Sequence, residues 1–511
     1  MWYSLSQDLE AQATRQIRDF ERYRKRTHDE NVRRARRSSG TPHLELVHRP
    51  SAWSLDPGFD PFHVRARAIP IGHAVTGALR RGGYQPHRPA GFLVPKVGGG
   101  SRLVNSYPIV DALLSNKLYR SLLEKNRPRL SARSYAYRSD LGPHDAIMHL
   151  QSEWGTEQRI FVAEYDFSKF FDRISHDHIW RTISSLGFIM TPLEERLLRA
   201  FLASPEPYTN ATEKAGAADA RTVGVPQGTS ISLLIANLAA TPLDRSLERL
   251  GVGFVRYADD TLIWSRDYAA VCEAVHTLHS AAEEIGSPIN YEKSEGVRLL
   301  VSEGTRNAEI RSTPRIEYLG HSIGLRDVRM KQAVVDKIKS HVSSLILNNL
   351  LREPIAGTQS LTRLTGTDRD YATLIWQLRR YLYGPLSESQ VRRFQQGTIP
   401  PMTFEGVMSF FPLVNDSAAL QELDSWIATQ VWLAVRKRAS LLKGFLTALP
   451  EPWARERQEL FRLVVPSTRT GKRVDLRLPS VVRVSSVIQA AVLTHGTKVV
   501  GSGHTLYLYE A

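Results

Sequence analysis

The chain has 511 residues, of which 42% are hydrophobic and 23% are charged. This composition is typical of a globular protein of two or three domains, and it excludes a chain that is disordered as a whole. The 67 Lys and Arg residues outnumber the 52 Asp and Glu residues, so the formal net charge is +15. A surplus of this size predicts a polyanionic partner, either nucleic acid or an anionic membrane surface.

The single cysteine, Cys272, excludes an internal disulfide and a zinc site built on two or more thiolates. It lies on the apolar face of an expected helix, which favours a packed core residue over a reactive thiol. No apolar run in the sequence approaches the roughly 20 residues that a membrane span needs. The first residues also lack the basic-then-apolar order of a secretory signal, so a cytoplasmic protein without a membrane partner is expected.

A basic segment near the start of the chain, residues 13–37, carries ten Lys or Arg residues against four acids. It contains no Pro or Gly, so a helix is expected. Two interpretations remain open: a solvated charged helix, or an arm that follows a nucleic-acid backbone. On the second interpretation, the residues predicted to bind nucleic acid are Arg22, Arg24, Lys25, Arg26, Arg33, Arg34, Arg36 and Arg37, with Arg15 and Arg18 before them.

From about residue 66 to 330 the sequence predicts mixed α and β structure. The expected elements, in chain order, are a hairpin over 92–104, a strand over 160–165, a strand–turn–strand unit over 253–265, an amphipathic helix over 271–285 and a second strand pair over 315–324. Helices predominate after 331. The last stretch, residues 473–510, alternates more like strands.

Three aspartates stand where strands end or turn. Asp166 follows the apolar strand 160–165, and Asp259 and Asp260 occupy the tight turn of YADD. Adjacent carboxylates repel each other, so their density needs an explanation. A divalent cation supplies one, because Mg²⁺ binds through a few carboxylates and substrate phosphates. The alternative is an Asp-rich turn that faces solvent, which a YADD string alone does not exclude.

A further segment, VGVPQGTSIS at 223–232, lies between these acids in the sequence. Pro226, Gln227 and Gly228 predict a turn at which the backbone can approach a ligand closely. A helix is expected to open directly afterwards, on Thr229 and Ser230. A P-Q-G turn by itself is only a loop, but its position in the order of the other motifs is specific.

That order resembles the order of motifs in reverse transcriptases, specifically the bacterial ones. Asp166 with FSKFFD is similar to their first catalytic motif, VPQGTSIS to the second and YADD to the third. NYEKS, which contains Lys293, and EYLG resemble the fourth and fifth. Upstream, FLVPKVGGGSRLV resembles the fingers hairpin, and SYAYR at 134–138 resembles the S-F-G-F-R run of group II intron and retron enzymes. The similarity covers about residues 66–330.

The resemblance implies an α+β fold: a right-hand polymerase with fingers and a ferredoxin-like palm, followed by a mainly helical, thumb-like C-terminal region. The expected domains are a basic N-terminal helical extension over 1–65, fingers and palm over 66–330, and the thumb-like extension over 331–511.

The resemblance also assigns roles to individual residues. Asp166, Asp259 and Asp260, with the backbone carbonyl of Phe167, would hold two Mg²⁺ ions, for which Mn²⁺ can substitute. Lys293 would act as general acid or would neutralise phosphate charge. The remaining residues would bind the nucleotide: Arg102 and Lys96 the triphosphate, Gln227 and Gly228 the nucleotide and template, and Phe171 the sugar as a steric gate.

The function implied is that of an RNA-directed DNA polymerase, with an RNA template, deoxynucleotides and a DNA product. One alternative is a maturase in which a polymerase core serves RNA binding, although three crowded acids have no purpose in a dead core. Another is an RNA-dependent RNA polymerase, which Phe171 and the YADD form argue against.

The biological role implied is antiphage defence with a structured non-coding RNA, because the region after 331 resembles the extensions of defence-associated enzymes. A retron or group II intron-type enzyme is the rival interpretation. A homo-oligomer or a partner defence protein is compatible with either role.

Overall fold

The computed structural model describes residues 5–95, 101–207, 221–305, 309–466 and 473–501. These residues form two compact units: one of residues 5–24 and 48–314, and one of residues 25–47 and 315–501. The first helix, α1 (Leu5–Arg37), contributes to both. Helices and strands are mixed along the chain, as the α+β expectation requires. Within the described ranges, no helix combines the length and the apolar character needed to cross a membrane.

The first unit combines helices with a five-stranded sheet and a separate hairpin. Its helices after α1 are α2 (Pro61–Ala66), α3 (Ala68–Arg81), α4 (Ile109–Asn126), α5 (Pro143–Trp154), α6 (Phe170–Arg173), α7 (His176–Ser185), α8 (Pro192–Leu202), α9 (Ser230–Leu250) and α10 (Tyr268–Ile285). Its strands are β1 (Ala90–Pro95), β2 (Ser101–Ser106), β3 (Arg159–Tyr165), β4 (Gly253–Tyr257), β5 (Asp260–Ser265), β6 (Gly296–Val301) and β7 (Ser312–Thr313).

The strand order of the main sheet is β4-β5-β3-β6-β7. The pairs β4–β5, β5–β3 and β3–β6 are antiparallel, and β7 adds a short parallel pairing at the edge. Along the chain, β3, α9, β4, β5, α10 and β6 follow the β-α-β-β-α-β order of a ferredoxin-like unit, with α6 to α8 inserted after β3. The strands expected at 160–165 and 253–265 and the helix expected at 271–285 are confirmed, as is the hairpin β1–β2.

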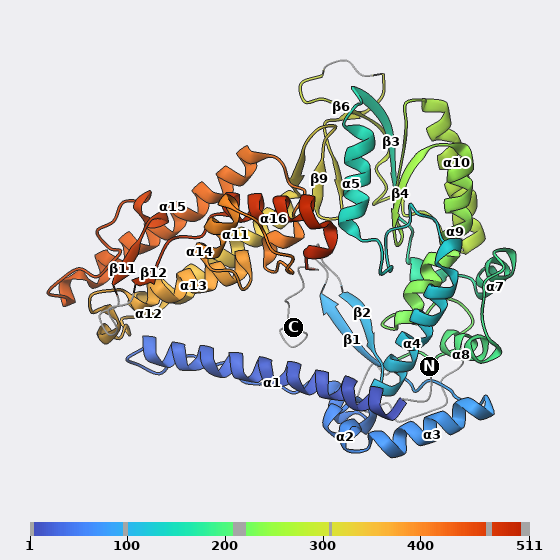
Figure 1. Cartoon of the computed structure of the whole chain (residues 1–511), viewed down its shortest axis with the longest axis horizontal. Helices are drawn as coiled ribbons and strands as arrows, with labels where there is room; N and C mark the ends of the chain where they lie inside the picture. The colour runs from blue at the N-terminus through green and yellow to red at the C-terminus, as the bar shows by residue number, and fades with distance from the viewer. Residues whose placement is uncertain (1–4, 96–100, 208–220, 306–308, 467–472, 502–511) are drawn as a thin grey trace. The chain divides into compact units, whose positions relative to one another are not determined.

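Helices cover both faces of this sheet. Consecutive strand residues point in opposite directions, so neighbouring residues of one strand contact helices on opposite faces. Ile263 of β5 joins the apolar core on the side of α9 and α10. The next residue, Trp264, packs on α5, with its ring 5.7 Å from Trp154 and 5.6 Å from His149. Figure 1 shows α5 and α10 flanking the strands from either side.

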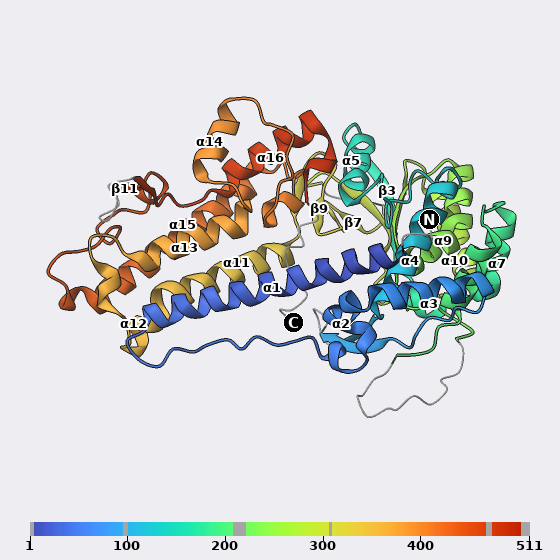
Figure 2. The ribbon, with the colours of Figure 1, turned by 60° about the horizontal axis from the view of Figure 1, so that its bottom comes forward.

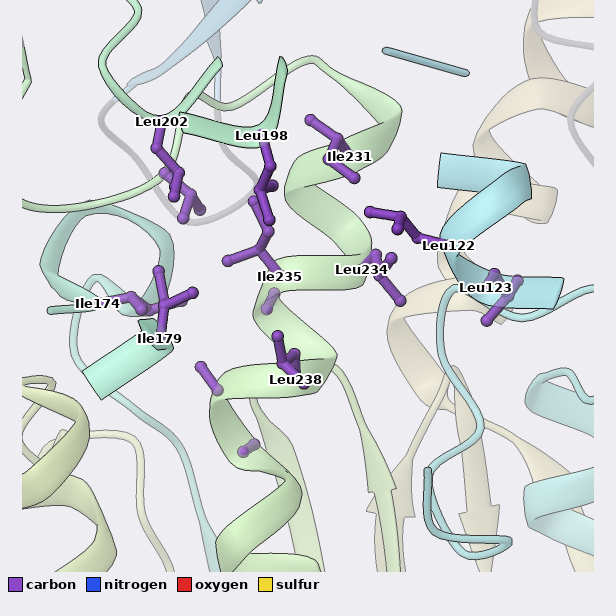
Figure 3. Close-up of a cluster of buried hydrophobic side chains, with 14 of the residues drawn as sticks. Leu122, Leu123, Ile174, Ile179, Leu198, Leu202, Ile231, Leu234, Ile235 and Leu238 are labelled. Atoms are coloured by element: carbon purple, nitrogen blue, oxygen red, sulfur yellow. The ribbon is translucent and has the colours of Figure 1, made fainter. Parts of the chain in front are cut away.

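Helix α9 lies at the centre of the core of this unit (Figure 3). Its apolar side chains contact α4 on one side and the segments of α7 and α8 on the other. The labelled residues of this cluster are Leu122, Leu123, Ile174, Ile179, Leu198, Leu202, Ile231, Leu234, Ile235 and Leu238. Each fully buried aliphatic side chain of this size stabilises the fold by roughly 1.5–3 kcal/mol. The N-terminus of α9 is thereby held on a rigid base.

The second unit is mainly helical. Its helices are the end of α1, α11 (Gln332–Ile346) with a π-helical continuation (Leu347–Leu351), α12 (Arg352–Ala356), α13 (Arg369–Tyr383), α14 (Glu388–Gln396), α15 (Ser417–Leu442) and α16 (Val481–His495). Its strands are β8 (Ile316–Tyr318), β9 (His321–Ile323), β10 (Val328–Met330), β11 (Val464–Pro466) and β12 (Arg473–Asp475). The pair β8–β9 confirms the strand pair expected at 315–324.

A fully buried arginine joins the long helices of this unit. Arg438 of α15 donates from Nε to Asp368 (2.7 Å) and from Nη2 to Asp370 (2.9 Å), two carboxylates at the start of α13. Its Nη1 donates to the Leu350 carbonyl (2.8 Å) and to Gln359 Oε1 (2.9 Å). All three charged side chains are completely buried, and Trp453 Nε1 also donates to Asp368 (2.9 Å) and Arg363 Nε to Asp370 (2.6 Å).

Two expectations from the sequence are wrong. Within the described residues 473–501, β12 is the only strand, and residues 481–495 form helix α16. The valines of that segment alternate like a strand, but the Ser480 side chain caps the helix, and Asp424 accepts from its first amides. The stretch 502–510 lies outside the described residues. Cys272 is exposed on α10, while its neighbour Val271 is buried, so the thiol is not a core residue.

Candidate active site

The strand register gathers the three aspartates at one edge of the sheet. In the β3–β5 pair, Tyr165 lies opposite Thr261. One step further along both strands, Asp166 comes level with Asp260, the first residue of β5. Asp259 precedes Asp260 in the two-residue turn between β4 and β5. The sequence motifs at 166 and 259–260, although about ninety residues apart, therefore meet at one end of β3.

The segment before β6 closes around Asp166. The Asp166 amide donates to Ser294 Oγ (3.2 Å), and its carbonyl accepts from the Asn290 amide (2.8 Å). Lys293 Nζ lies 3.7 Å from Asp166 Oδ2, and the lysine side chain is 70% exposed. Burial raises the pKa of Asp166, and Lys293 opposes that rise. The edge thus presents a partly desolvated carboxylate beside a solvent-exposed cation.

The turn that carries Asp259 has an unusual backbone. Ala258 adopts a φ of 63°, in the left-handed region that favours glycine. An L-residue in this conformation costs roughly 1–2 kcal/mol, which the surrounding structure must offset. The loop between Tyr257 and Asp260 consists of Ala258 and Asp259 alone, so Asp259 is the one other loop residue that can share the bend. The direction of Asp259 is therefore set by a strained residue directly before it.

Arg256, two residues before Ala258, is completely buried beneath this turn. Its Nη1 donates to the Ala258 carbonyl (2.8 Å). Its Nε and Nη2 fork onto Asp244 of α9 at 2.7 and 2.6 Å, and Nη2 also donates to Ser134 Oγ (3.0 Å). Asn237 of α9 accepts from the same guanidinium through Oδ1 (3.2 Å). One side chain thus connects the turn to α9 and to the segment at 134.

The P-Q-G turn lies against the segment that follows Asp166. The Val225 amide donates to the Phe171 carbonyl (2.7 Å), and Gln227 Nε2 donates to Asp172 Oδ1 (2.7 Å). Gly228 has a φ of 95°, and a Cβ atom there would meet the Asn105 carbonyl of β2 at 2.1 Å. Glycine is therefore required at 228 for both backbone angle and space. The P-Q-G turn therefore lies beside the segment of Phe171 and Asp172 and beside β2.

Phe171 occupies the predicted strand-to-helix corner, in the short helix α6. Its ring lies edge-on to Tyr137 at 6.4 Å and to Phe170 at 6.0 Å. Tyr137 in turn lies 6.5 Å from Tyr257, the residue that opens YADD. Phe170 is 2% exposed and belongs to the core, whereas Phe171 is partly exposed at the core's edge. The two adjacent phenylalanines therefore face different surroundings.

The two basic residues predicted on the hairpin are described unequally. Lys96 lies outside the described residues. The backbone of Arg102 lies in β2 opposite Val94, but its side chain lies outside what the structure describes. The closeness of Gly228 to Asn105, three residues further along β2, connects the hairpin strand to the P-Q-G turn.

Phe167 is buried, and it pairs with Ile289 in an isolated antiparallel bridge. The hydrogen bonds of that bridge use the carbonyls of Asp166 and Pro288, so the Phe167 carbonyl takes no part in it. In the described part of the chain, no group of three or more His, Cys, Asp or Glu side chains is arranged to hold a metal ion. Carboxylates are the ligands that Mg²⁺ prefers, and it commonly uses one or two of them with substrate phosphates. The donor set at this edge suits a cation that arrives with phosphate.

The basic residues of α1 differ in their surroundings. Arg22 and Arg24 are exposed, and they form ion pairs with Asp19 and Glu21 on the same helix. Arg15, Arg18, Lys25 and Arg36 are also exposed, and Arg26 is partly buried. Arg33 and Arg34 both pair with Glu30, and Arg34 also with Glu45.

Arg37 corrects one prediction. Its side chain is 2% exposed and bonds to Glu30, to the Asn348 carbonyl (2.6 Å) and to Asn349 Oδ1 (2.9 Å). Figure 2 shows this end of α1 beside α12, and the Ser38–Gln359 bridge agrees with it. The Arg37 guanidinium is therefore used inside the second unit, where it cannot reach a phosphate. Its asparagine partners lie more than 300 residues away in the sequence, so the burial was not foreseeable.

Sequence reasoning missed three residues at this edge: Arg256, Asp172 and Tyr137. Only Arg256 had a usable signal, because a charge inside the apolar strand GFVRY must find a buried partner. Asp172 and Tyr137 act through contacts with Gln227 and Phe171 that depend on the tertiary fold.

Comparison with known proteins agrees with this geometry. Residues 94–323 match the family model described as reverse transcriptase (RNA-dependent DNA polymerase). This region is a reverse transcriptase domain. It contains the β1–β2 hairpin from Val94 onward, the sheet edge with its three aspartates, and the pair β8–β9. Reverse transcriptase domains are nucleotidyltransferases that synthesise DNA on RNA.

Individual relatives are more distant. The COX1/OXI3 intron 1 protein of Saccharomyces cerevisiae is 28% identical over 159 residues, which are 30% of this chain and 18% of that protein. The chain thus spans less than a fifth of the length of this curated relative. Among solved structures, apo telomerase from Candida tropicalis has a TM-score of 0.40 at 12% identity, covering 82% of this chain and 64% of that one. Telomerase from Candida albicans with a fragment of telomeric RNA has a TM-score of 0.36 at 12% identity, covering 70% and 62%.

Proposed function

We propose that the chain is an RNA-directed DNA polymerase, which extends a 3′-hydroxyl with deoxynucleotides copied from RNA. The observation that carries this proposal is the sheet edge where Asp166 comes level with Asp260, one residue from Asp259. That edge lies inside the region that matches the reverse transcriptase family. RNA is the expected template, DNA the product, and deoxynucleoside triphosphates the substrates.

Asp166, Asp259 and Asp260 would hold two Mg²⁺ ions, with the Phe167 carbonyl as a further ligand and Mn²⁺ as a substitute. Bound Mg²⁺ supplies Lewis-acid activation of the 3′-hydroxyl and stabilises the leaving pyrophosphate. Lys293 reaches within 3.7 Å of Asp166, so its ammonium group can neutralise phosphate charge or donate a proton to the pyrophosphate. The exposure of Lys293 supports this role, because a substrate can approach it from solvent.

The residues beside the aspartates would form the nucleotide site. Gln227, held by Asp172, and Gly228, whose backbone lies against β2, would contact the nucleotide and the template. Phe171 would exclude a 2′-hydroxyl, since a ring packed edge-on against Tyr137 resists displacement. Arg102 and Lys96 would grip the triphosphate from the β1–β2 hairpin, where a guanidinium can fork onto phosphate oxygens.

In this proposal the hairpin β1–β2 belongs to the fingers and the sheet with α9 and α10 to the palm, over residues 66–330. Residues 331–511 form a thumb-like extension and residues 1–65 a basic extension. The exposed basic residues of α1 would contact RNA phosphates. Arg37 is excluded from this role, and Arg33 and Arg34 bind RNA only if they leave Glu30.

The biological role follows one of two routes. Antiphage defence with a structured non-coding RNA rests on the resemblance of the region after 331 to defence-associated enzymes. A retron or intron-type enzyme is the alternative, and the similarity to a yeast intron 1 protein favours the intron-type form. Sequencing the RNA and DNA that co-purify with the chain separates these roles: a single non-coding RNA supports defence or a retron, and intron RNA supports a maturase.

Primer extension tests the proposed activity. The full chain is given an RNA template of mixed sequence with an annealed DNA primer, then deoxynucleotides or ribonucleotides, with Mg²⁺ or with EDTA. The proposal predicts extension with deoxynucleotides, complementary to the template and abolished by EDTA. Extension with ribonucleotides alone would instead support an RNA polymerase, and binding of the duplex without any extension would support a maturase.

A further inference from the structure

We propose that Arg256 is a positioning residue of the polymerase site, which holds the strained turn at Ala258 so that Asp259 and Asp260 keep a metal-binding arrangement. This inference rests on the proposed function, because it assigns to those aspartates the role of metal ligands. Arg256 itself contacts neither nucleotide nor metal in this account. It acts through the Ala258 carbonyl.

The hydrogen bonds of Arg256 specify this role more closely than burial alone. A buried arginine needs a carboxylate, and Asp244, itself completely buried, supplies both oxygens to Nε and Nη2. The remaining arm, Nη1, is directed at the Ala258 carbonyl (2.8 Å) and at Asn237 Oδ1. The planar guanidinium fixes these directions together, which a lysine ammonium cannot do.

The backbone of Arg256 adds a second tether on the outer edge of β4. Its amide donates to the Arg133 carbonyl (3.0 Å), and its carbonyl accepts from the Tyr135 amide (2.9 Å). The same strand segment, through Ser134, also bonds to the guanidinium. Three residues after Ser134 is Tyr137, which packs against Phe171. The turn and the proposed sugar site are therefore built on one shared support.

The turn needs such a support. Ala258 has a left-handed φ, and Asp259 is the one other residue of the two-residue loop, so the hairpin reaches its observed form only if other contacts favour it. If the bond to the Ala258 carbonyl is lost, the loop can relax toward ordinary angles and Asp259 turns away. The expected consequence is a weaker metal site with an intact duplex-binding surface.

Arg256→Lys and Arg438→Lys form a matched pair for the test. Both replace a completely buried, carboxylate-paired arginine, one beneath the turn and one in the second unit. The measurements are kcat, KM for the deoxynucleotide, the Mg²⁺ concentration for half-maximal rate, affinity for an RNA–DNA duplex, and Tm. We expect Arg256→Lys to lower kcat about tenfold and to raise the half-saturating Mg²⁺ severalfold, with duplex affinity unchanged. Arg438→Lys should lower Tm and leave the Mg²⁺ requirement as in the wild type.

A second variant keeps the test informative if Arg256→Lys fails to fold. Arg256→Met/Asp244→Leu removes both buried charges, a replacement that is often neutral for stability. It cannot restore the bond to Ala258. A Tm near that of the wild type with a raised Mg²⁺ requirement supports positioning, whereas a wild-type Mg²⁺ requirement in both Arg256 variants overturns it and leaves a purely structural arginine.

A readout independent of activity separates this inference from the proposed function. Mn²⁺ binding to the full chain with duplex, followed by electron paramagnetic resonance, reports on the metal site without turnover. A wild type that binds Mn²⁺ but never extends a primer contradicts the proposed polymerase. In that case a weaker Mn²⁺ affinity in Arg256→Lys still supports the positioning role, and an equal affinity overturns it.

Discussion

The two compact units each contain a completely buried arginine, and the two guanidinium groups differ in the groups to which they donate hydrogen bonds. Arg438 joins α15 to the two carboxylates at the start of α13. Arg256 also pairs with a buried carboxylate, but one of its arms bonds to the turn beside Asp259. Burial and ion pairing therefore do not distinguish a structural charge from one that serves a site. The distinction lies in the groups to which the guanidinium donates besides its carboxylate.

The largest expected effect is at the sheet edge itself. Asp259→Ala/Asp260→Ala removes two proposed metal ligands from a partly exposed turn, so the fold should survive while metal binding fails. Primer extension should fall by about a thousandfold or more, equivalent to about 4 kcal/mol in the activation barrier. The matched control is Glu283→Ala/Glu284→Ala, an exposed pair of acids on α10, which should retain wild-type activity.

Breaking the network in the second unit should affect stability and spare the chemistry. Arg438→Met leaves Asp368 and Asp370 buried without their shared cation, which costs about 3–5 kcal/mol in the free energy of unfolding. Urea unfolding measures the loss, and primer extension per folded molecule should stay near the wild-type value. A large drop in kcat for fully folded Arg438→Met would contradict the claim that the Arg438 network affects stability alone.

Glu194 lies in the same unit as Arg256 but on α8, away from the sheet edge, so we expect it to stabilise the fold without affecting activity. Burial alone would raise the pKa of Glu194, but bonds from Lys125, Ser121 and Thr191 together lower it to about 2. Its contribution to stability is therefore present above the unfolded pKa of about 4.3 and is lost as pH falls toward 2. Glu194→Gln should cost about 2 kcal/mol at pH 7.

The pH dependence of unfolding checks this assignment. The difference between wild type and Glu194→Gln should shrink between about pH 4.5 and pH 2, because the wild-type carboxylate becomes protonated there. Activity at pH 7 should be unchanged, since Glu194 lies on α8 and not at the sheet edge. A difference that stays constant with pH would show that the ionised form of Glu194 is not what stabilises the fold.

Phe171 gives a smaller effect on chemistry, in sugar selection. Phe171→Ala opens the space that a 2′-hydroxyl would need, so the ratio of kcat/KM for dGTP and GTP should fall about tenfold, or about 1.4 kcal/mol. Tyr137→Leu removes only the edge-on support of that ring and should lower the ratio less. Efficient use of GTP by the wild type would contradict the role of Phe171 as a steric gate.

The smallest effect is expected on the surface of α1. Changing the exposed Arg15, Arg18, Lys25 and Arg36 to Gln should weaken RNA binding and reduce its salt dependence by roughly 0.7 per lost phosphate contact. Changing Arg33 and Arg34 to Gln instead should alter the salt dependence of RNA binding little, because these two arginines already form ion pairs with Glu30 and Glu45. Equal slopes for all three proteins would return α1 to the interpretation of a solvated helix.

The sheet edge with the three aspartates was largely predictable from the sequence because its information is local. A strand that ends at Asp166 and a turn that contains Asp259 and Asp260 can be predicted from a short apolar run and from a tight turn between two apolar segments. The amphipathic pattern likewise predicted α10. The β-α-β-β-α-β order then requires the chain segments to meet at one sheet edge.

What the sequence did not yield depends on distant partners. The Ser134 that bonds to Arg256 is 122 positions away from it, and the asparagines that bury Arg37 lie 311 and 312 positions away. Helix α16 was misread because its valines suit a strand, whereas the Asp424 carboxylate that stabilises its first turn belongs to another helix. Tertiary contacts of this kind override local propensity.

The most direct test of the central claim counts metal ions at the sheet edge. The full chain is bound to an RNA–DNA duplex and a non-hydrolysable deoxynucleotide analogue, and Mn²⁺ is titrated with detection by electron paramagnetic resonance. The account predicts two Mn²⁺ ions per molecule in the wild type, as two-metal phosphoryl transfer requires, and loss of tight binding in Asp259→Ala/Asp260→Ala at an unchanged Tm. The same number of tightly bound ions in both proteins would contradict it.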